Sequence, residues 1–166
     1  MPSARLTFLL VAAGCASLML IAWLYFQTWL GLNPCPLCMT QRIFVVAAGL
    51  VALAAFFHAP GQTGRRIYSV TGFLFSASGA GVAARHIWLQ SLPADQVPAC
   101  GPGLSYMFET LPFMQALEVL FQGDGNCADV VWSFLGLSIP GWTLVAFVSI
   151  CAIFVWQFVR KDLPWH

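Results

Sequence analysis

Long stretches without a charged residue are the feature that most constrains how this chain can fold. Two of them, residues 6–26 and 139–159, contain 21 residues each. At about 1.5 Å per residue, a helix of that length crosses a hydrocarbon layer roughly 30 Å thick. Residues 67–84 form a third apolar or small run, and residues 43–57 form a fourth. We therefore expect an all-α membrane protein built as a four-helix transmembrane bundle.

The fourth run must extend backward to match the others. Its 15 residues give only about 22 Å of helix, and an extension through Arg42 and Cys38 supplies the missing length. Both residues would then lie within the helix, at the membrane surface. The expected arrangement is one membrane domain over residues 1–166, with spans at about 6–26, 38–57, 67–88 and 139–159.

Composition also indicates a chain surrounded by lipid. Hydrophobic residues make up 60% of the 166 and charged residues 8%, against about 45–50% and 25% in a typical soluble domain. The seven basic and six acidic residues nearly balance, which disfavours nucleic acid as a partner. Such high hydrophobicity also excludes intrinsic disorder.

Basic residues set the expected orientation of the bundle. They gather in the segments that would share one side of the membrane: Arg5, Arg65, Arg66, Arg160 and Lys161. The positive-inside rule makes that side cytoplasmic, so both termini are expected there. The loops on the opposite side are then residues 27–40 and 90–138. We interpret the first span as an uncleaved anchor, because its apolar run is longer than that of a signal peptide.

The six cysteines fall into two classes by position. Cys15 and Cys151 lie inside expected spans, where a free cysteine behaves as a small hydrophobic residue. The other four lie in the two external loops: Cys35, Cys38, Cys100 and Cys127. In a bacterium these loops would face an oxidising compartment, where disulfides persist.

The first-loop pair has the properties of a reactive dithiol. Cys35 and Cys38 form a Cys-x-x-Cys motif where the second span begins, and the N–H groups and dipole of a helix amino terminus stabilise a thiolate. Arg42 follows Cys38 by four residues, on the same helix face. Its permanent positive charge favours the thiolate form of Cys38 further.

The second-loop pair allows two interpretations. A disulfide between Cys100 and Cys127 would close a long loop and stabilise it by about 3 kcal/mol or more, so the pair is interpretable as a structural staple. The apolar pattern of residues 113–121 predicts a short helix in the membrane interface. That helix would hold the loop near the first pair, which favours a redox role instead.

A candidate binding pocket lies at the end of the third span. His86 and Gln90 share a helix face there. In an antiparallel bundle they have the same depth as Cys38 and Arg42. Apolar walls, a few hydrogen-bond donors and a neighbouring thiolate suit a lipid-soluble carbonyl compound.

Together these features resemble the DsbB family, the bacterial inner-membrane proteins called disulfide bond formation protein B. The resemblance covers nearly the whole chain and combines motifs that are individually weak. It rests on the Cys-x-x-Cys with Arg42, His86 and Gln90 before the long loop, the pair Cys100 and Cys127, the segments GNCA at 125–128 and WSFLGL at 132–137, and Pro140.

The resemblance implies an electron path through four catalytic cysteines. A reduced DsbA-like periplasmic protein would attack Cys100 of a Cys100–Cys127 disulfide. Cys127 would then attack Cys35, which frees Cys38 as a thiolate. Cys38 would pass the electrons to a membrane quinone.

The resemblance also implies the cofactor and its ligands. The quinone would be ubiquinone, with menaquinone as the alternative, and no metal is expected. Arg42 and His86 would polarise the quinone oxygen, and Gln90 would belong to the same binding pocket. The protein would reside in the bacterial inner membrane, with the lipid bilayer, the quinone and the DsbA-like protein as partners.

Three other interpretations remain open. The vitamin K epoxide reductase family is similar in its membrane helices, cysteines and quinone, but its Cys-x-x-Cys follows the loop pair, whereas here it comes first. A non-catalytic four-span protein with a stapled loop would leave the Cys-x-x-Cys beside Arg42 unexplained. A zinc site of four cysteines is disfavoured in an oxidising compartment. Thiol titration separates them: four reducible external sulfurs indicate exchange, two a staple, and metal-dependent protection zinc.

Overall fold

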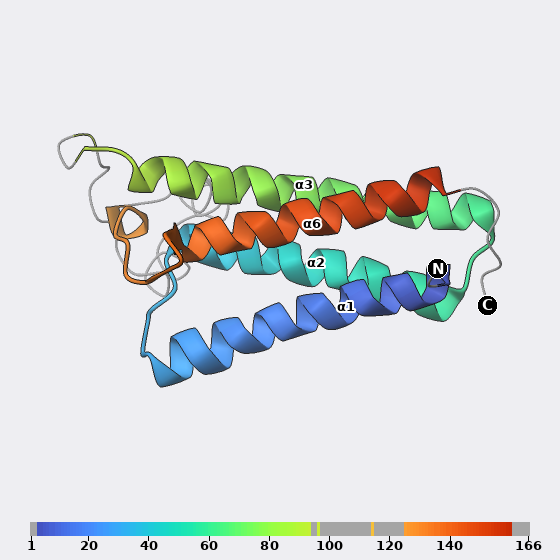
Figure 1. Ribbon diagram of the computed structural model, residues 1–166, viewed down its shortest axis with the longest axis horizontal. Coiled ribbons are helices and arrows are strands. Elements are labelled where there is room, and N and C mark those ends of the chain that lie inside the picture. The colour runs from blue at the N-terminus through green and yellow to red at the C-terminus, as the bar shows by residue number, and fades with distance from the viewer. Residues whose placement is uncertain (1–2, 94–95, 97–113, 115–124, 161–166) are drawn as a thin grey trace.

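The computed structural model describes residues 3–93, 96, 114 and 125–160. Four long helices run side by side along the molecule (Figure 1). They are α1 (Ala4–Leu20), continued by the π-helix η1 (Ile21–Trp29), then α2 (Pro36–His58), α3 (Gln62–Gln90) and α6 (Ile139–Val159). Each is long and apolar enough to cross a membrane. The expected four-helix membrane bundle is confirmed, while of the expected interfacial helix at 113–121 only Met114 lies among the described residues.

The bundle has two chemically different ends. At one end, η1 and α3 finish at Trp29 and Gln90, and α2 and α6 begin at Pro36 and Ile139. We call it the cysteine end, because Cys35 directly precedes α2 there. The other, the arginine end, contains Ala4, His58, Gln62 and Val159.

The start of α2 is set by local capping chemistry. Cys35 is extended (φ −71°, ψ 166°) and its sulfur accepts the backbone N–H of Cys38 at 3.4 Å. Pro36 follows at the first helical position, where its fixed φ and missing N–H carry no penalty. The helix therefore contains Cys38 and Arg42, and Cys35 is its N-cap residue.

The seam between α3 and α6 is tightly packed. A Cβ atom on Gly72 would lie 2.3 Å from Cζ of Phe154, and one on Gly79 would lie 2.3 Å from Cζ of Phe147. Both phenylalanines are fully buried. The missing side chains of the two glycines thus let the rings rest directly on the α3 backbone, as small residues do between membrane helices.

The opposite side of the bundle is open at the cysteine end. The helix formed by α1 and η1 diverges there from the other three (Figure 1). Hydrogen bonds in η1 reach five residues back, as from the Leu30 N–H to the Tyr25 carbonyl at 3.0 Å. Such π-type turns often occur at functional sites. None of the nine residues of η1 is buried.

A small β-hairpin precedes α6 and was not expected from the sequence. Strands β1 (Ser133–Phe134) and β2 (Leu137–Ser138) pair antiparallel. Leu135 and Gly136 connect them with φ values of 51° and 81°, the signs required by a type I′ turn. The indole N–H of Trp142 donates to the Phe134 carbonyl at 3.1 Å, so the hairpin is fixed to α6.

Candidate functional site

Three side chains from separate segments meet at the cysteine end. Cys35 comes from the start of α2, His86 from the last turns of α3, and Cys127 from a short 3-10 turn. Their two sulfurs and the nearest imidazole nitrogen all lie within 4.8 Å of one another. Cys35 Sγ is 3.8 Å from His86 Nε2. The sequence predicts a catalytic role for both cysteines but does not place His86 beside Cys35.

Packing fixes the position of Cys127. Its side chain is fully buried in a small apolar cluster with Leu37, Val82 and Leu89. These residues come from the ends of α2 and α3. The second-loop cysteine is therefore held against the helices that carry Cys35 and His86.

Gln41 orients the His86 ring. Its amide nitrogen lies 3.1 Å from His86 Nδ1, and both side chains are buried. Because an amide N–H can only donate, Nδ1 is the acceptor in this geometry. A neutral His86 then carries its proton on Nε2, the nitrogen that faces Cys35 Sγ. Cys35, His86 and Gln41 thus form a chain of polar contacts inside the bundle.

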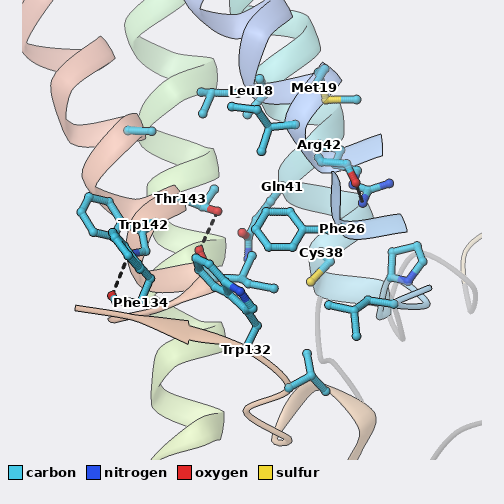
Figure 2. A pocket seen from close by; sticks show the side chains of 18 of the residues that line it. Leu18, Met19, Phe26, Cys38, Gln41, Arg42, Trp132, Phe134, Trp142 and Thr143 are labelled. Carbon is cyan, nitrogen blue, oxygen red and sulfur yellow. Dashed lines mark hydrogen bonds between the residues drawn. The ribbon is translucent and has the colours of Figure 1, made fainter. Parts of the chain in front are cut away.

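Cys38 borders two cavities of very different size. The larger has a volume of about 490 Å³ and lies between η1, α2, α6 and the hairpin (Figure 2). It is mostly apolar, with Cys38, Gln41 and Arg42 among its polar lining residues. The smaller, of about 60 Å³, is lined by Cys35, Cys38, His86, Gln90 and Asp129 among others.

Arg42 links α2 to the π-helix. One guanidinium nitrogen donates to the Gln27 side-chain oxygen at 2.9 Å, and the other donates to the Ala22 carbonyl at 3.1 Å. The positive charge is thereby held at the edge of the larger cavity, one helical turn from Cys38 (Figure 2).

A row of aromatic rings forms one wall of the larger cavity. Phe26 of η1 meets Trp132 edge-to-face with centroids 5.1 Å apart. Trp132 stacks with Phe134 at 6.1 Å, and Phe134 contacts Trp142 at 6.2 Å. Sequence reasoning had assigned these rings no role, because they gather only when η1, the hairpin and α6 come together.

The structure separates the residues predicted for quinone binding. Arg42 lines the larger cavity, whereas His86 and Gln90 line the smaller one, and Cys38 lines both. Gln90 accepts a hydrogen bond from the Ser138 hydroxyl at 2.7 Å. Cys15 is buried in the helical core and Cys151 is half-buried on α6. Cys100 lies outside the described residues.

Clustered thiols beside an apolar cavity in a membrane bundle are the arrangement expected of a membrane thiol oxidoreductase. The family model described as "Disulfide bond formation protein DsbB" matches residues 4–157. This chain therefore belongs to the DsbB family and is a disulfide-forming oxidoreductase of the membrane.

Relatives agree with this assignment over almost their whole length. The chain is 60% identical to disulfide bond formation protein B of Saccharophagus degradans over 161 residues, 97% of this chain and 96% of the relative. It is 52% identical to the Hahella chejuensis protein of the same name, covering 95% and 94%. Disulfide bond formation protein B 1 of Pseudomonas aeruginosa is 45% identical, covering 96% and 97%.

Proposed function

We propose that this protein oxidises a DsbA-like periplasmic thioredoxin-fold protein and passes the electrons to membrane quinone, either ubiquinone or menaquinone. It would act in the bacterial inner membrane, with both termini in the cytoplasm, and sustain disulfide formation in periplasmic proteins. The observation that carries this proposal is the position of Cys38, which borders both the cavity of the thiol cluster and the large apolar cavity.

The first steps are two thiol–disulfide exchanges. A thiolate of the partner attacks Cys100 of the Cys100–Cys127 disulfide, which forms a mixed disulfide and releases Cys127. Cys127 then attacks Cys35 in the Cys35–Cys38 disulfide, and Cys38 leaves as a thiolate. The separation of at most 4.8 Å between the Cys35 and Cys127 sulfurs supports this second exchange. The second thiolate of the partner resolves the mixed disulfide, which releases the oxidised partner and frees Cys100. Cys100 then attacks Cys127 in the Cys35–Cys127 disulfide, which restores the Cys100–Cys127 disulfide and leaves Cys35 and Cys38 as a dithiol.

His86 is placed to move a proton during these exchanges. Its Nε2 lies near both Cys35 and Cys127, so it accepts a proton from an attacking thiol and returns one to a departing thiolate. Gln41 fixes the ring for this task. The sequence suggested contact between His86 and the quinone, whereas its position beside Cys35 supports proton transfer at sulfur.

The quinone step uses the larger cavity that Cys38 lines. A cavity of about 490 Å³ falls within the range of roughly 300–1,000 Å³ typical of small-molecule sites. A quinone bound there would accept two electrons and two protons from the Cys35–Cys38 dithiol, which would close to a disulfide. Arg42 stabilises the Cys38 thiolate and the negative charge that develops on the quinone oxygen.

Energetics require such an acceptor. A DsbA-type oxidant has a potential of about −120 mV, and each 30 mV corresponds to about 1.4 kcal/mol for two electrons. Regenerating it needs an acceptor at least as oxidising, which ordinary protein thiols do not supply. The exchanges alone would therefore stall without the quinone.

The test is Cys38→Ser in the full-length protein, reconstituted with a DsbA-type partner and a soluble ubiquinone analogue. The variant should still form the mixed disulfide at Cys100, since that step precedes Cys38, but it should not reduce quinone. Cys151→Ser, which alters a half-buried thiol of α6, is the matched control and should retain both reactions. Quinone reduction that survives in Cys38→Ser would end the proposal.

A further inference from the structure

The cluster of Cys35, His86 and Cys127 has the composition of a metal site. Thiolates and imidazole are the ligands that Zn²⁺ prefers. With Zn–S bonds of about 2.3 Å and Zn–N bonds of about 2.0 Å, neighbouring ligand atoms in a tetrahedral site lie roughly 3.6–3.8 Å apart. Cys35 Sγ and His86 Nε2 are 3.8 Å apart, and all three ligand atoms lie within 4.8 Å. Movements of these atoms by about 1 Å or less would therefore fill three of the four coordination positions of a tetrahedral zinc ion.

The surroundings of His86 also suit a metal ligand. Histidines that bind metals are held by a partner on their second ring nitrogen, and Gln41 occupies that position at 3.1 Å. When a cation takes Nε2, the ring proton moves to Nδ1. The Gln41 amide can then turn over and accept that proton through its oxygen. The same buried pair thus supports both the free and the metal-bound ring.

The fourth position opens onto the smaller cavity. This space of about 60 Å³ adjoins Cys35 and His86, and a water molecule needs only about 10–15 Å³ of such space. Two thiolates neutralise a dication, so the complex adds no net charge to a buried site. A water molecule bound there would complete the tetrahedron.

We propose that Zn²⁺ binds Cys35, His86 and Cys127 only when both cysteines are reduced, and that it thereby arrests disulfide exchange. Binding releases the two thiol protons and involves no electron transfer. In either disulfide of the proposed cycle the sulfurs are unavailable, so the oxidised protein does not bind the ion. The inference rests on the proposed function only in one respect, namely that disulfide formation in the proposed cycle prevents binding of the ion.

Metal binding by the reduced full-length protein tests the inference directly. Zn²⁺ is titrated anaerobically in lipid nanodiscs against a chromophoric chelator, and Cd²⁺ reports thiolate ligands by its charge-transfer absorption. We expect one tight equivalent in the reduced protein and none in the oxidised protein. Cys127→Ser and His86→Gln should each weaken binding by at least about 100-fold, and Gln41→Leu by about 10–100-fold.

Control variants separate this site from binding by other thiols. Cys38→Ser and Cys100→Ser should both retain tight binding, because neither supplies a ligand. Cys127→Ala and His86→Ala repeat the two ligand deletions with different side chains, and helicity is measured for every variant. Unchanged binding after loss of Cys127 or His86, or loss of binding in Cys38→Ser, overturns the site. Because the titration contains neither quinone nor partner, its failure is distinct from failure of the proposed function.

Discussion

The two sides of the bundle are built in opposite ways. Along the α3–α6 seam, glycine faces phenylalanine, and a single added carbon at Gly72 or Gly79 would overlap a buried ring. Where α1 continues into η1, the helix departs from α-geometry and diverges from its neighbours, and a cavity of about 490 Å³ lies there instead of a packed core. The residues of the proposed reaction lie where the two sides meet.

This difference assigns separate tasks to the helices. His86 projects from α3, on the tightly packed side, and therefore has a fixed position beside Cys35. Arg42 projects from α2 toward the π-helix, on the open side, where a ligand can enter. In the proposed mechanism, rigid packing would serve the sulfur exchanges, which need fixed geometry, and the opening would serve the lipid-soluble quinone.

The largest expected effect comes from removing charge on the open side. Arg42→Gln should lower kcat/KM for quinone by about 100-fold, because one preorganised group that stabilises developing charge is typically worth that much. Mixed-disulfide formation with the partner should be unchanged. Stopped-flow quinone reduction measures the first quantity and non-reducing electrophoresis the second.

Arg85→Gln is the matched control for that substitution. Arg85 is exposed on α3, with its guanidinium 5.9 Å from the Trp88 ring centroid, and it does not line either described cavity. Its loss should leave quinone kinetics within about two-fold of the parent. Equal losses in the two variants would show that net charge, rather than the position of Arg42, controls the rate.

On the tight side, the expected effect is on stability. Gly79→Ala should lower the free energy of unfolding by about 1–3 kcal/mol, because the added methyl group overpacks against Phe147. Gly81→Ala is the control, since nothing lies within 4 Å of its Cβ position, and it should be neutral or slightly stabilising. Denaturant unfolding in mixed micelles compares them. Equal stabilities would refute the close packing of the seam.

The sequence predicts much of the packed side and little of the open side. Uncharged runs locate four helices because length and hydrophobicity are local properties, and the short run at 43–57 correctly requires a helix that contains Cys38 and Arg42. No feature of the sequence distinguishes the π-helix, because the residues of Ile21–Trp29 have the composition of an ordinary apolar helix. The hairpin was missed because Leu135 adopts a positive φ, which large residues seldom do.

The direction of a side chain was equally hard to predict. Helical spacing gives His86 and Gln90 the correct depth, yet it does not say which cavity they line, since that depends on the rotation of α3 against α2 and α6. Only the assembled bundle shows His86 beside Cys35 and Gln90 beside Ser138.

A smaller effect is expected at the aromatic wall of the open side. Trp132→Leu should raise KM for quinone by about 3–10-fold, equivalent to the roughly 0.5–1.5 kcal/mol of an aromatic pair, with kcat unchanged at saturating quinone. Trp23→Leu alters an exposed ring of η1 and should leave KM unchanged. Steady-state kinetics measure KM for both variants. An equal rise of KM in Trp23→Leu would mean that general hydrophobicity, and not the position of Trp132, causes the effect.

The smallest expected effect concerns the hydrogen bond that joins the hairpin to the end of α3. Ser138, directly before α6, donates to Gln90 at the end of α3 at 2.7 Å. Ser138→Ala should lower the free energy of unfolding by about 0.5–1.5 kcal/mol. Ser149→Ala removes an exposed hydroxyl that donates to the Val145 carbonyl of its own helix. It is the control and should change stability by less than about 0.5 kcal/mol.

A double-mutant cycle shows whether Ser138 and Gln90 stabilise the protein through this hydrogen bond. If Ser138 and Gln90 act only through each other, Ser138→Ala combined with Gln90→Leu should destabilise the protein less than the sum of the single changes, because the second substitution removes a bond already lost. Additive changes would mean that each side chain acts independently. Trp132 directly precedes the hairpin, which ends at Ser138. A stabilising Ser138–Gln90 bond therefore also predicts that Ser138→Ala raises KM for quinone slightly, by about two-fold, since α3 would then help to position the aromatic wall of the open side.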